Sequence, residues 1–184
     1  DLNITSNAIG PEGGVALAGA LCVNTELTSL NLRETNIGSK GGLALADALH
    51  FNDSLTSLDV HDITIDNSVT EKLASAVLQQ RSLLRFGEVP IQDLRAGKLK
   101  ELNLQQKHLG VTGARVLGVL LAVSKSLTAL NLNKSLPELE SRLAIVKALA
   151  RNTSLTVLDL GQNAIGLEDG MVLATTLSDN ASLT

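Results

Sequence analysis

Three side chains that could do chemistry stand close together in the sequence: Asp59, His61 and Asp62. A histidine flanked by two carboxylates could move a proton or bind a metal ion. A catalytic or metal site would also need a nucleophile or a third ligand, and the sequence places neither beside them. Strand alternation directs residues 59 and 61 outward and leaves residue 62 in the turn. We therefore interpret the trio as part of a solvated binding face, and expect no catalytic residue, metal or cofactor.

Two glycine-rich stretches and one cysteine also invite a chemical interpretation. The stretches "GPEGG" and "GSKGG", which begin at Gly10 and Gly38, resemble phosphate loops, but no Gly-Lys-Ser/Thr follows. Similar glycines recur at Gly113 and Gly170, which indicates a structural role. Cys22 is the only cysteine, so it predicts neither a disulfide nor a zinc site and favours a reducing, cytoplasmic location.

The chain repeats with a fixed period. The motifs "LTSLNL", "LTSLDV", "LKELNL", "LTALNL" and "LTVLDL" begin at Leu27, Leu55, Leu99, Leu127 and Leu155. The spacing is 28 residues except between Leu55 and Leu99, where it is 44. Extending the pattern to both ends places Leu2 and Leu183 inside further repeats, which suggests a piece of a longer array.

Each repeat predicts a strand followed by a helix. The motif alternates apolar and polar residues, whereas the segment after it has apolar residues at helical spacing. Pro11 suits a first helical turn and Asp66 an N-cap. We expect Asn24, Asn52, Asn152 and Asn180, three of them in Asn-x-Ser/Thr sequons, to end helices in the left-handed conformation. The expected helices are near 11–22, 39–50, 67–79, 111–123, 139–150 and 167–178.

This pattern resembles the leucine-rich repeat, L-x-x-L-x-L-x-x-N/C-x-L, and its length is similar to the ribonuclease-inhibitor-like form also found in NOD-like receptors. The resemblance implies an α/β fold: a right-handed solenoid (horseshoe) with an inner parallel sheet and outer helices, as a single domain over residues 1–184. The asparagine of the family pattern is present at Asn7 and Asn163. Thr35, Ile63, Lys107 and Ser135 replace it elsewhere, so we expect less regular turns there.

The irregular spacing contains one full repeat, 55–82, and a 16-residue remainder, "LLRFGEVPIQDLRAGK", over 83–98. The remainder is too short for a strand and a three-turn helix. We expect a strand near residues 84–86 and no outer helix in 83–98. Phe86, Ile91 and Leu94 should fill the core in place of that helix.

A basic segment surrounds this remainder in a chain of net charge −4. Residues 81–125 hold eight Lys and Arg against three Asp and Glu. We define the basic island as Arg81, Arg85, Arg95, Lys98 and Lys100, and predict that it binds a partner with an acidic surface. The alternative is a deleted helix over which the neighbouring repeats closed, with no role in recognition.

Repeat solenoids present extended surfaces with few deep pockets, so a protein ligand is expected. We predict a non-enzymatic protein–protein interaction module that binds neither membranes nor, given its acidic charge and two aromatic residues, nucleic acids. Its concave binding residues are predicted to be Arg33, Glu34, Asp59, His61, Asp62, Gln105, Asn131, Asn133 and Asp159. The resemblance also implies two alternatives, a regulator that activates a small GTPase and the ligand-sensing part of an immune-type receptor.

Overall fold

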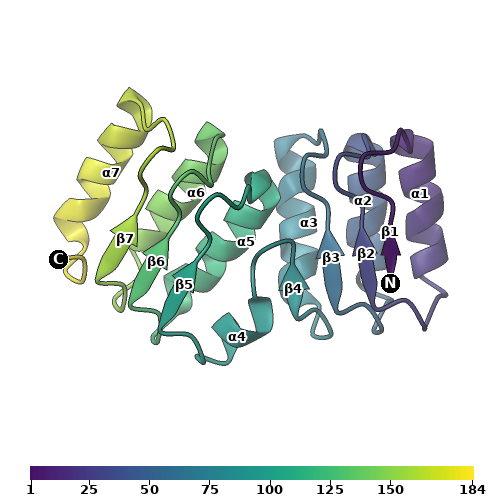
Figure 1. Ribbon diagram of the computed structural model, residues 1–184, viewed down its shortest axis with the longest axis horizontal. Coiled ribbons are helices and arrows are strands. Elements are labelled where there is room, and N and C mark those ends of the chain that lie inside the picture. The colour runs from purple at the N-terminus through teal and green to yellow at the C-terminus, as the bar shows by residue number, and fades with distance from the viewer. The chain divides into compact units, whose positions relative to one another are not determined.

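Seven short strands alternate with seven helices in the computed structural model, which describes residues 1–184 (Figure 1). The strands are β1 (Leu2–Asn3), β2 (Ser29–Asn31), β3 (Ser57–Asp59), β4 (Arg85–Phe86), β5 (Glu101–Asn103), β6 (Ala129–Asn131) and β7 (Val157–Asp159). The helices are α1 (Gly10–Leu21), α2 (Gly38–Ala48), α3 (Asn67–Gln79), α4 (Ile91–Arg95), α5 (Gly110–Val123), α6 (Leu139–Leu149) and α7 (Leu167–Asp179). None of them combines the length and apolar character that crossing a membrane requires.

The chain divides into two compact units, unit 1 over Asp1–Gly87 and unit 2 over Glu88–Thr184. Unit 1 holds a four-stranded parallel sheet in the order β1-β2-β3-β4, and unit 2 holds a three-stranded parallel sheet in the order β5-β6-β7. In each unit the long helices cover one face of the sheet (Figure 1). The predicted single domain over 1–184 stays a prediction.

The 28-residue period sets the strand register. Leu30 pairs with Leu2 on one side and Leu58 on the other, and Leu130 pairs with Leu102 and Leu158. Leu30, Leu58 and Leu130 are at most 2% exposed, because the middle residue of each strand points toward the helices. The α/β leucine-rich-repeat architecture is confirmed, and all six expected long helices are present within two residues of their predicted ends.

The prediction that residues 83–98 carry no helix is wrong, because α4 forms there. It has five residues, begins after Pro90, and is followed by Gly97 at φ +64°. Ile91 and Leu94, three positions apart on one helix face, are 0% and 5% exposed. The strand expected near residues 84–86 is β4, and Phe86 is 3% exposed, so the three predicted core residues are confirmed.

The asparagines after the helices do not adopt the left-handed conformation, contrary to the sequence-based expectation. Asn152 is 3% exposed, and its Nδ2 donates to the Leu121 carbonyl at 2.7 Å and the Ser124 carbonyl at 3.4 Å, in the preceding repeat. Its Oδ1 accepts from the Leu155 N–H at 2.7 Å, and Asn52 makes the equivalent bonds to Leu21, Asn24 and Leu55. Each amide therefore ties a helix end of one repeat to the strand entry of the next. Attaching a glycan at the Asn52 or Asn152 sequon would break these bonds.

The inner turns are held by a side-chain hydrogen bond at two of the four positions where the family's asparagine is missing. Asn163 donates to the Leu132 and Leu160 carbonyls at 2.8 and 2.9 Å and accepts from two backbone N–H groups of the preceding repeat. The hydroxyls of Thr35 and Ser135 donate to the carbonyls of Leu32 and Leu104. At these two positions a hydroxyl therefore replaces part of the amide's function, whereas Lys107 is exposed.

We expect Asn152→Ala to lower the free energy of unfolding by about 2–4 kcal/mol, because it leaves buried carbonyl and N–H groups without partners. Asn24→Ala is the matched control: the side chain of the exposed Asn24 accepts only from the N–H groups of Glu26 and Leu27, so about 1 kcal/mol or less should be lost. Urea unfolding of both variants measures the difference. Equal losses would contradict the role assigned to the buried amide.

Asp66, the N-cap of α3, should make stability depend on pH. Hydrogen bonds from the Val69 N–H and then from the Ser68 and Ser39 hydroxyls lower the pKa of its carboxyl to about 2. Since the folded-state pKa lies below the unfolded value, the stabilisation is complete above about pH 4 and is lost as the pH falls toward 2. Melting temperatures of the wild type and Asp66→Asn should therefore converge between pH 5 and pH 2. A constant difference across this range would exclude the ionised cap.

Candidate functional site

The last residue of each regular strand forms a turn with the backbone that follows. The Oδ1 atoms of Asn31, Asp59, Asn131 and Asp159 each accept a hydrogen bond, at 2.8–3.0 Å, from the N–H group two residues on. Asn3 and Asn103 do the same at 3.0 Å. Three predicted binding residues, Asp59, Asn131 and Asp159, therefore use one carboxylate or amide oxygen to shape the turn.

Three residues after each of these turn-forming side chains, the backbone is left-handed although no glycine is present. The residues are Ser6, Glu34, Asp62, Gln106, Lys134 and Gln162, with φ between 55° and 59°. Their positions differ by the 28-residue period within each unit. The turn geometry is thus constant from repeat to repeat, while the side chain that it displays changes in size and charge.

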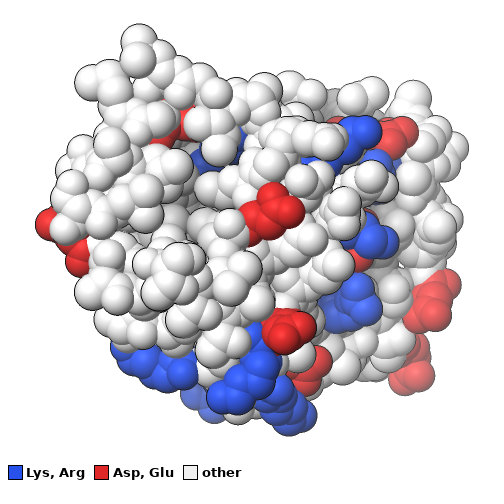
Figure 2. All heavy atoms as spheres, turned by 60° about the vertical axis from the view of Figure 1, so that its left-hand side comes forward, with Lys and Arg blue, Asp and Glu red and all other residues white.

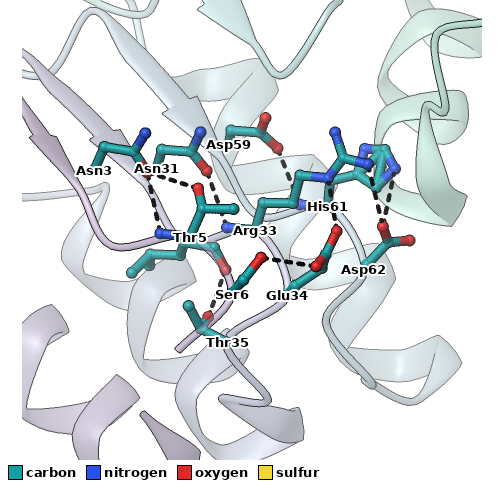
Figure 3. A network of polar contacts seen from close by, with 11 residues as sticks. Asn3, Thr5, Ser6, Asn31, Arg33, Glu34, Thr35, Asp59, His61 and Asp62 are labelled. Atoms are coloured by element: carbon teal, nitrogen blue, oxygen red, sulfur yellow. Dashed lines mark hydrogen bonds and ion pairs between the residues drawn. The ribbon is translucent and has the colours of Figure 1, made fainter. Parts of the chain in front are cut away.

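The turns of unit 1 bring four of the predicted residues into one network (Figure 3). Arg33 Nε lies 3.4 Å from Glu34 Oε1, and Arg33 Nη2 lies 3.6 Å from Asp62 Oδ2. Asp62 Oδ2 is also 3.5 Å from His61 Nε2, and Ser6 Oγ donates to Glu34 Oε2 at 2.8 Å. One arginine therefore lies between two carboxylates that come from consecutive repeats.

Burial separates the histidine from the charges around it. The side chains of Arg33, Asp62 and Glu34 are 38%, 42% and 47% exposed, whereas that of His61 is only 6% exposed. The expectation that His61 points into solvent is wrong. β3 ends at Asp59, so strand alternation no longer directs residue 61. No group of three or more His, Cys, Asp or Glu side chains is arranged to hold a metal ion.

The corresponding turns of unit 2 display several amides together with the charged Asp159 and Lys134. Gln105 and Asp159 are exposed and Asn131 and Asn133 are half-buried. Asn133 Nδ2 lies 3.4 Å from Asp159 Oδ1 of the next repeat. The predicted concave residues thus form a charged group in unit 1 and an amide-rich group in unit 2.

The five residues of the basic island are all exposed, but they belong to both units. Arg81 and Arg85 are in unit 1, and Arg95, Lys98 and Lys100 are in unit 2. Lys98 Nζ lies 3.7 Å from Asp93 Oδ1, and partial burial lowers the pKa of the Arg95 guanidinium. That all five act as one surface stays a prediction.

Sequence reasoning missed a depression at the helix ends of unit 1. Its volume is about 310 Å³ and its lining is Leu49, His50, Asp53, Ala76, Gln79, Gln80 and Arg81. Phe51, next to His50, is 72% exposed, and Val23, one repeat earlier, is 81% exposed. Val23 and Phe51 come directly after a helix and do not fit the periodic apolar pattern. Apolar residues at such positions are the sequence signal that could have indicated an exposed apolar surface beside the depression.

The charged network of unit 1 should contribute little to folding. Arg33→Ala is expected to change the free energy of unfolding by less than about 1 kcal/mol, because ion pairs this exposed are screened by water. Leu58→Ala, which truncates a fully buried side chain one repeat on, should cost about 2–5 kcal/mol under the same urea titration. Comparable losses in the two variants would mean that the network is structural.

Comparison with known proteins adds the following. A family model described as "Leucine Rich repeat" matches residues 1–18, 23–46 and 151–174. No curated protein matches the chain. Similar solved structures include leiomodin-1 actin-binding site 2, at 20% identity and a TM-score of 0.42, where 97% of this chain and 79% of the other are covered. The tropomodulin C-terminal domain of Caenorhabditis elegans matches at 14% identity and a TM-score of 0.40, with 97% and 82% covered. TM-scores this low do not indicate a shared function.

The segments matched by the family model and the repeating strand and helix units both identify the fold as a leucine-rich-repeat solenoid.

Proposed function

We propose that this protein is a non-enzymatic protein–protein interaction module that binds its partner through the turns following the strands. The observation that carries the proposal is the left-handed residue of each regular turn. The backbone there is the same in six turns, while the side chain is serine, glutamate, aspartate, glutamine or lysine. A rigid scaffold that presents different side chains at fixed intervals is suited to reading a large, irregular surface such as that of a protein.

We propose that the partner is a protein whose acidic surface contacts the basic island. Binding would take place in the reducing environment of the cytoplasm. Cys22, the only cysteine, is a free and exposed thiol, as is usual in that compartment. The finer assignment to the ribonuclease-inhibitor-like subfamily belongs to the same proposal and rests on repeat length and motif.

A photo-crosslinking amino acid at position 33 tests which surface is used. Position 72, where Lys72 is exposed on α3, provides the matched control. We expect a protein to be crosslinked from position 33 and not from position 72. The same protein, once purified, should bind the wild type in calorimetry.

The charge-swap variant Arg33→Glu/Asp62→Lys then tests the residues themselves. It keeps an ion pair within the network but reverses the charges that a partner meets, so binding should weaken at least about tenfold with no change in melting temperature. Lys72→Glu should bind like the wild type. Equal crosslinking at both positions, or a swap without effect on affinity, would overturn the proposal.

Two narrower functions, a small-GTPase activator and the ligand-sensing region of an immune-type receptor, are compatible with the fold. A GTP hydrolysis assay with a panel of small GTPases separates the first from a binding module. Stimulation of hydrolysis by the wild type, abolished in the charge-swap variant, would replace the general proposal with this specific one.

A further inference from the structure

The helix ends of unit 1 combine exposed apolar side chains with the depression described above. Val23 and Phe51 occupy the same position in consecutive repeats and are 81% and 72% exposed. Gln79 occupies this position in the next repeat and lines the depression of about 310 Å³. Large exposed apolar side chains in adjacent repeats, beside such a hollow, indicate a binding surface.

Hydrogen bonds hold these helix ends next to one another. Asn52 Nδ2 donates to the carbonyls of Leu21 and Asn24, both at 2.9 Å. Gln80 Nε2 donates to the Leu49 carbonyl at 2.8 Å and to the Asn52 carbonyl. The segments that follow α1, α2 and α3 are therefore adjacent, and their exposed side chains form one surface. We call it the helix-end surface of unit 1, and it comprises Val23, Phe51 and the depression.

The charges on this surface are mostly negative. The last turns of α1, α2 and α3 and the segments that lead on to the strands carry Glu26, Asp47, Asp53 and Arg81. All four side chains are exposed, and none of them forms an ion pair. The helix dipole favours cations at helix C-termini, so it does not account for the three carboxylates.

The acidic character of the helix ends is specific to unit 1. The last turns and the following segments of unit 2 carry Arg95, Lys98, Lys100, Lys125, Lys147 and Arg151 against Asp93 and Asp179. Lys and Arg side chains gather along the lower edge of Figure 2, the edge at which the strands begin in Figure 1. Charge complementarity therefore favours a basic ligand for the helix ends of unit 1 and an acidic one for those of unit 2.

The rim of the depression presents hydrogen-bond acceptors. His50 Nδ1 donates to the Ala46 carbonyl at 2.9 Å, which leaves Nε2 of the neutral ring as an acceptor. Gln79 Nε2 donates to Ser75 Oγ at 3.1 Å, which leaves Oε1 of this amide as an acceptor. Asp53 adds a carboxylate, so three side chains of the lining can accept hydrogen bonds from a ligand.

The depression suits a lysine side chain. Its lining residues Leu49 and Ala76 are 2% and 3% exposed and give it an apolar floor. A lysine buries its alkyl stem on apolar surface while its ammonium group, with three N–H donors and no acceptor, stays at the polar edge. The acceptors at the rim match those donors. Arg81 is the only cation among the lining residues, and its charge opposes such a ligand.

We propose that the helix-end surface of unit 1 binds a protein segment that carries a lysine next to a large apolar residue. The lysine occupies the depression, and the apolar side chain packs on Phe51 and Val23. This inference goes beyond the proposed function, because the turns of that proposal follow the strands whereas this surface precedes them. Of the residues named for it, only Arg81 belongs to a surface defined earlier, the basic island.

Fluorescence anisotropy of a labelled nine-residue peptide tests the proposal. The peptide holds three lysines, two tryptophans placed beside lysines, and four serines. One control peptide has glutamate in place of each lysine, and the other has serine in place of each tryptophan. The full chain should bind the first peptide at least about threefold more tightly than either control, with an affinity that falls as salt rises from 50 to 300 mM. A control that binds as tightly, or no binding of the first peptide, would overturn the proposal.

Charge variants locate the lysine. Asp53→Lys should weaken binding at least about fivefold, because it places a cation where the ammonium group binds. Asp179→Lys reverses an exposed acid at a helix end of unit 2 and, as the matched control, should change the affinity less than about twofold. Arg81→Glu should strengthen binding at least about twofold, because it removes the opposing charge. Weaker binding by Arg81→Glu would mean that the surface attracts acidic ligands, contrary to the proposal.

Phe51→Ser tests the apolar contact. It should weaken binding at least about threefold, whereas Val123→Ser, which changes a 64% exposed valine at the same repeat position in unit 2, should have less than about a twofold effect. Circular dichroism melting verifies that the variants remain folded. If Asp53→Lys is unfolded, Asp53→Asn takes its place and should weaken binding at least about twofold. Equal binding by Phe51→Ser and the wild type would exclude Phe51 from the site and overturn the proposal.

Two further measurements separate this inference from its alternatives. Sedimentation equilibrium should give the same mass for the wild type and Phe51→Ser, and a dimer that is lost in the variant would place a second copy of the chain on this surface and overturn the proposal. Phe51→Ser should still be crosslinked to a protein from position 33. If the lysine peptide does not bind while that crosslink forms, only this inference fails and the proposed function stands.

Discussion

Contacts between successive repeats depend on a buried amide at the end of three of the six long helices. The last carbonyls of a helix have no partner within that helix, and in an array they face the next repeat, where water has little access. Asn52 and Asn152 satisfy these carbonyls while accepting an N–H at the entry to their own strand. Gln80 uses its longer side chain for the same purpose, donating to the Leu49 carbonyl at 2.8 Å. Because the donor and the acceptor belong to one planar group, the amide fixes both the helix end and the strand register.

The contacts that stabilise the repeats and the side chains that vary on the surface therefore involve different atoms. The core consists of layers of leucine, isoleucine, valine and alanine with a single phenylalanine, Phe86, and its strands are only two or three residues long. Most of the polar hydrogen bonds that hold the repeats together involve backbone groups, which any sequence supplies. The side chains of the turns and of the helix-to-strand segments are consequently free to differ between repeats, as they do between Glu26 and Lys98 at equivalent positions.

The sequence predicted the long helices well because periodicity extends over eleven or more residues in each of them. It missed α4 because five residues contain only one apolar pair, Ile91 and Leu94, which is too short a pattern to separate from a loop. The amide function of Asn152 was missed for another reason, since its partner Leu121 lies 31 residues earlier and no local pattern reports such a bond. The predicted concave residues lie at the last strand position or in the turn that follows it, and the ion pairs among them depend on side-chain reach across repeats, which no sequence pattern reports.

The left-handed turn residues have a consequence for the surface that the turns present. An L-amino acid in this conformation is strained by roughly 1–2 kcal/mol, and glycine would remove the strain at each position without disturbing the turn. None of the six positions, from Ser6 to Gln162, is glycine, although the chain uses 15 glycines elsewhere. The backbone path of these turns is therefore compatible with glycine, and what distinguishes one turn from the next is the side chain that it displays.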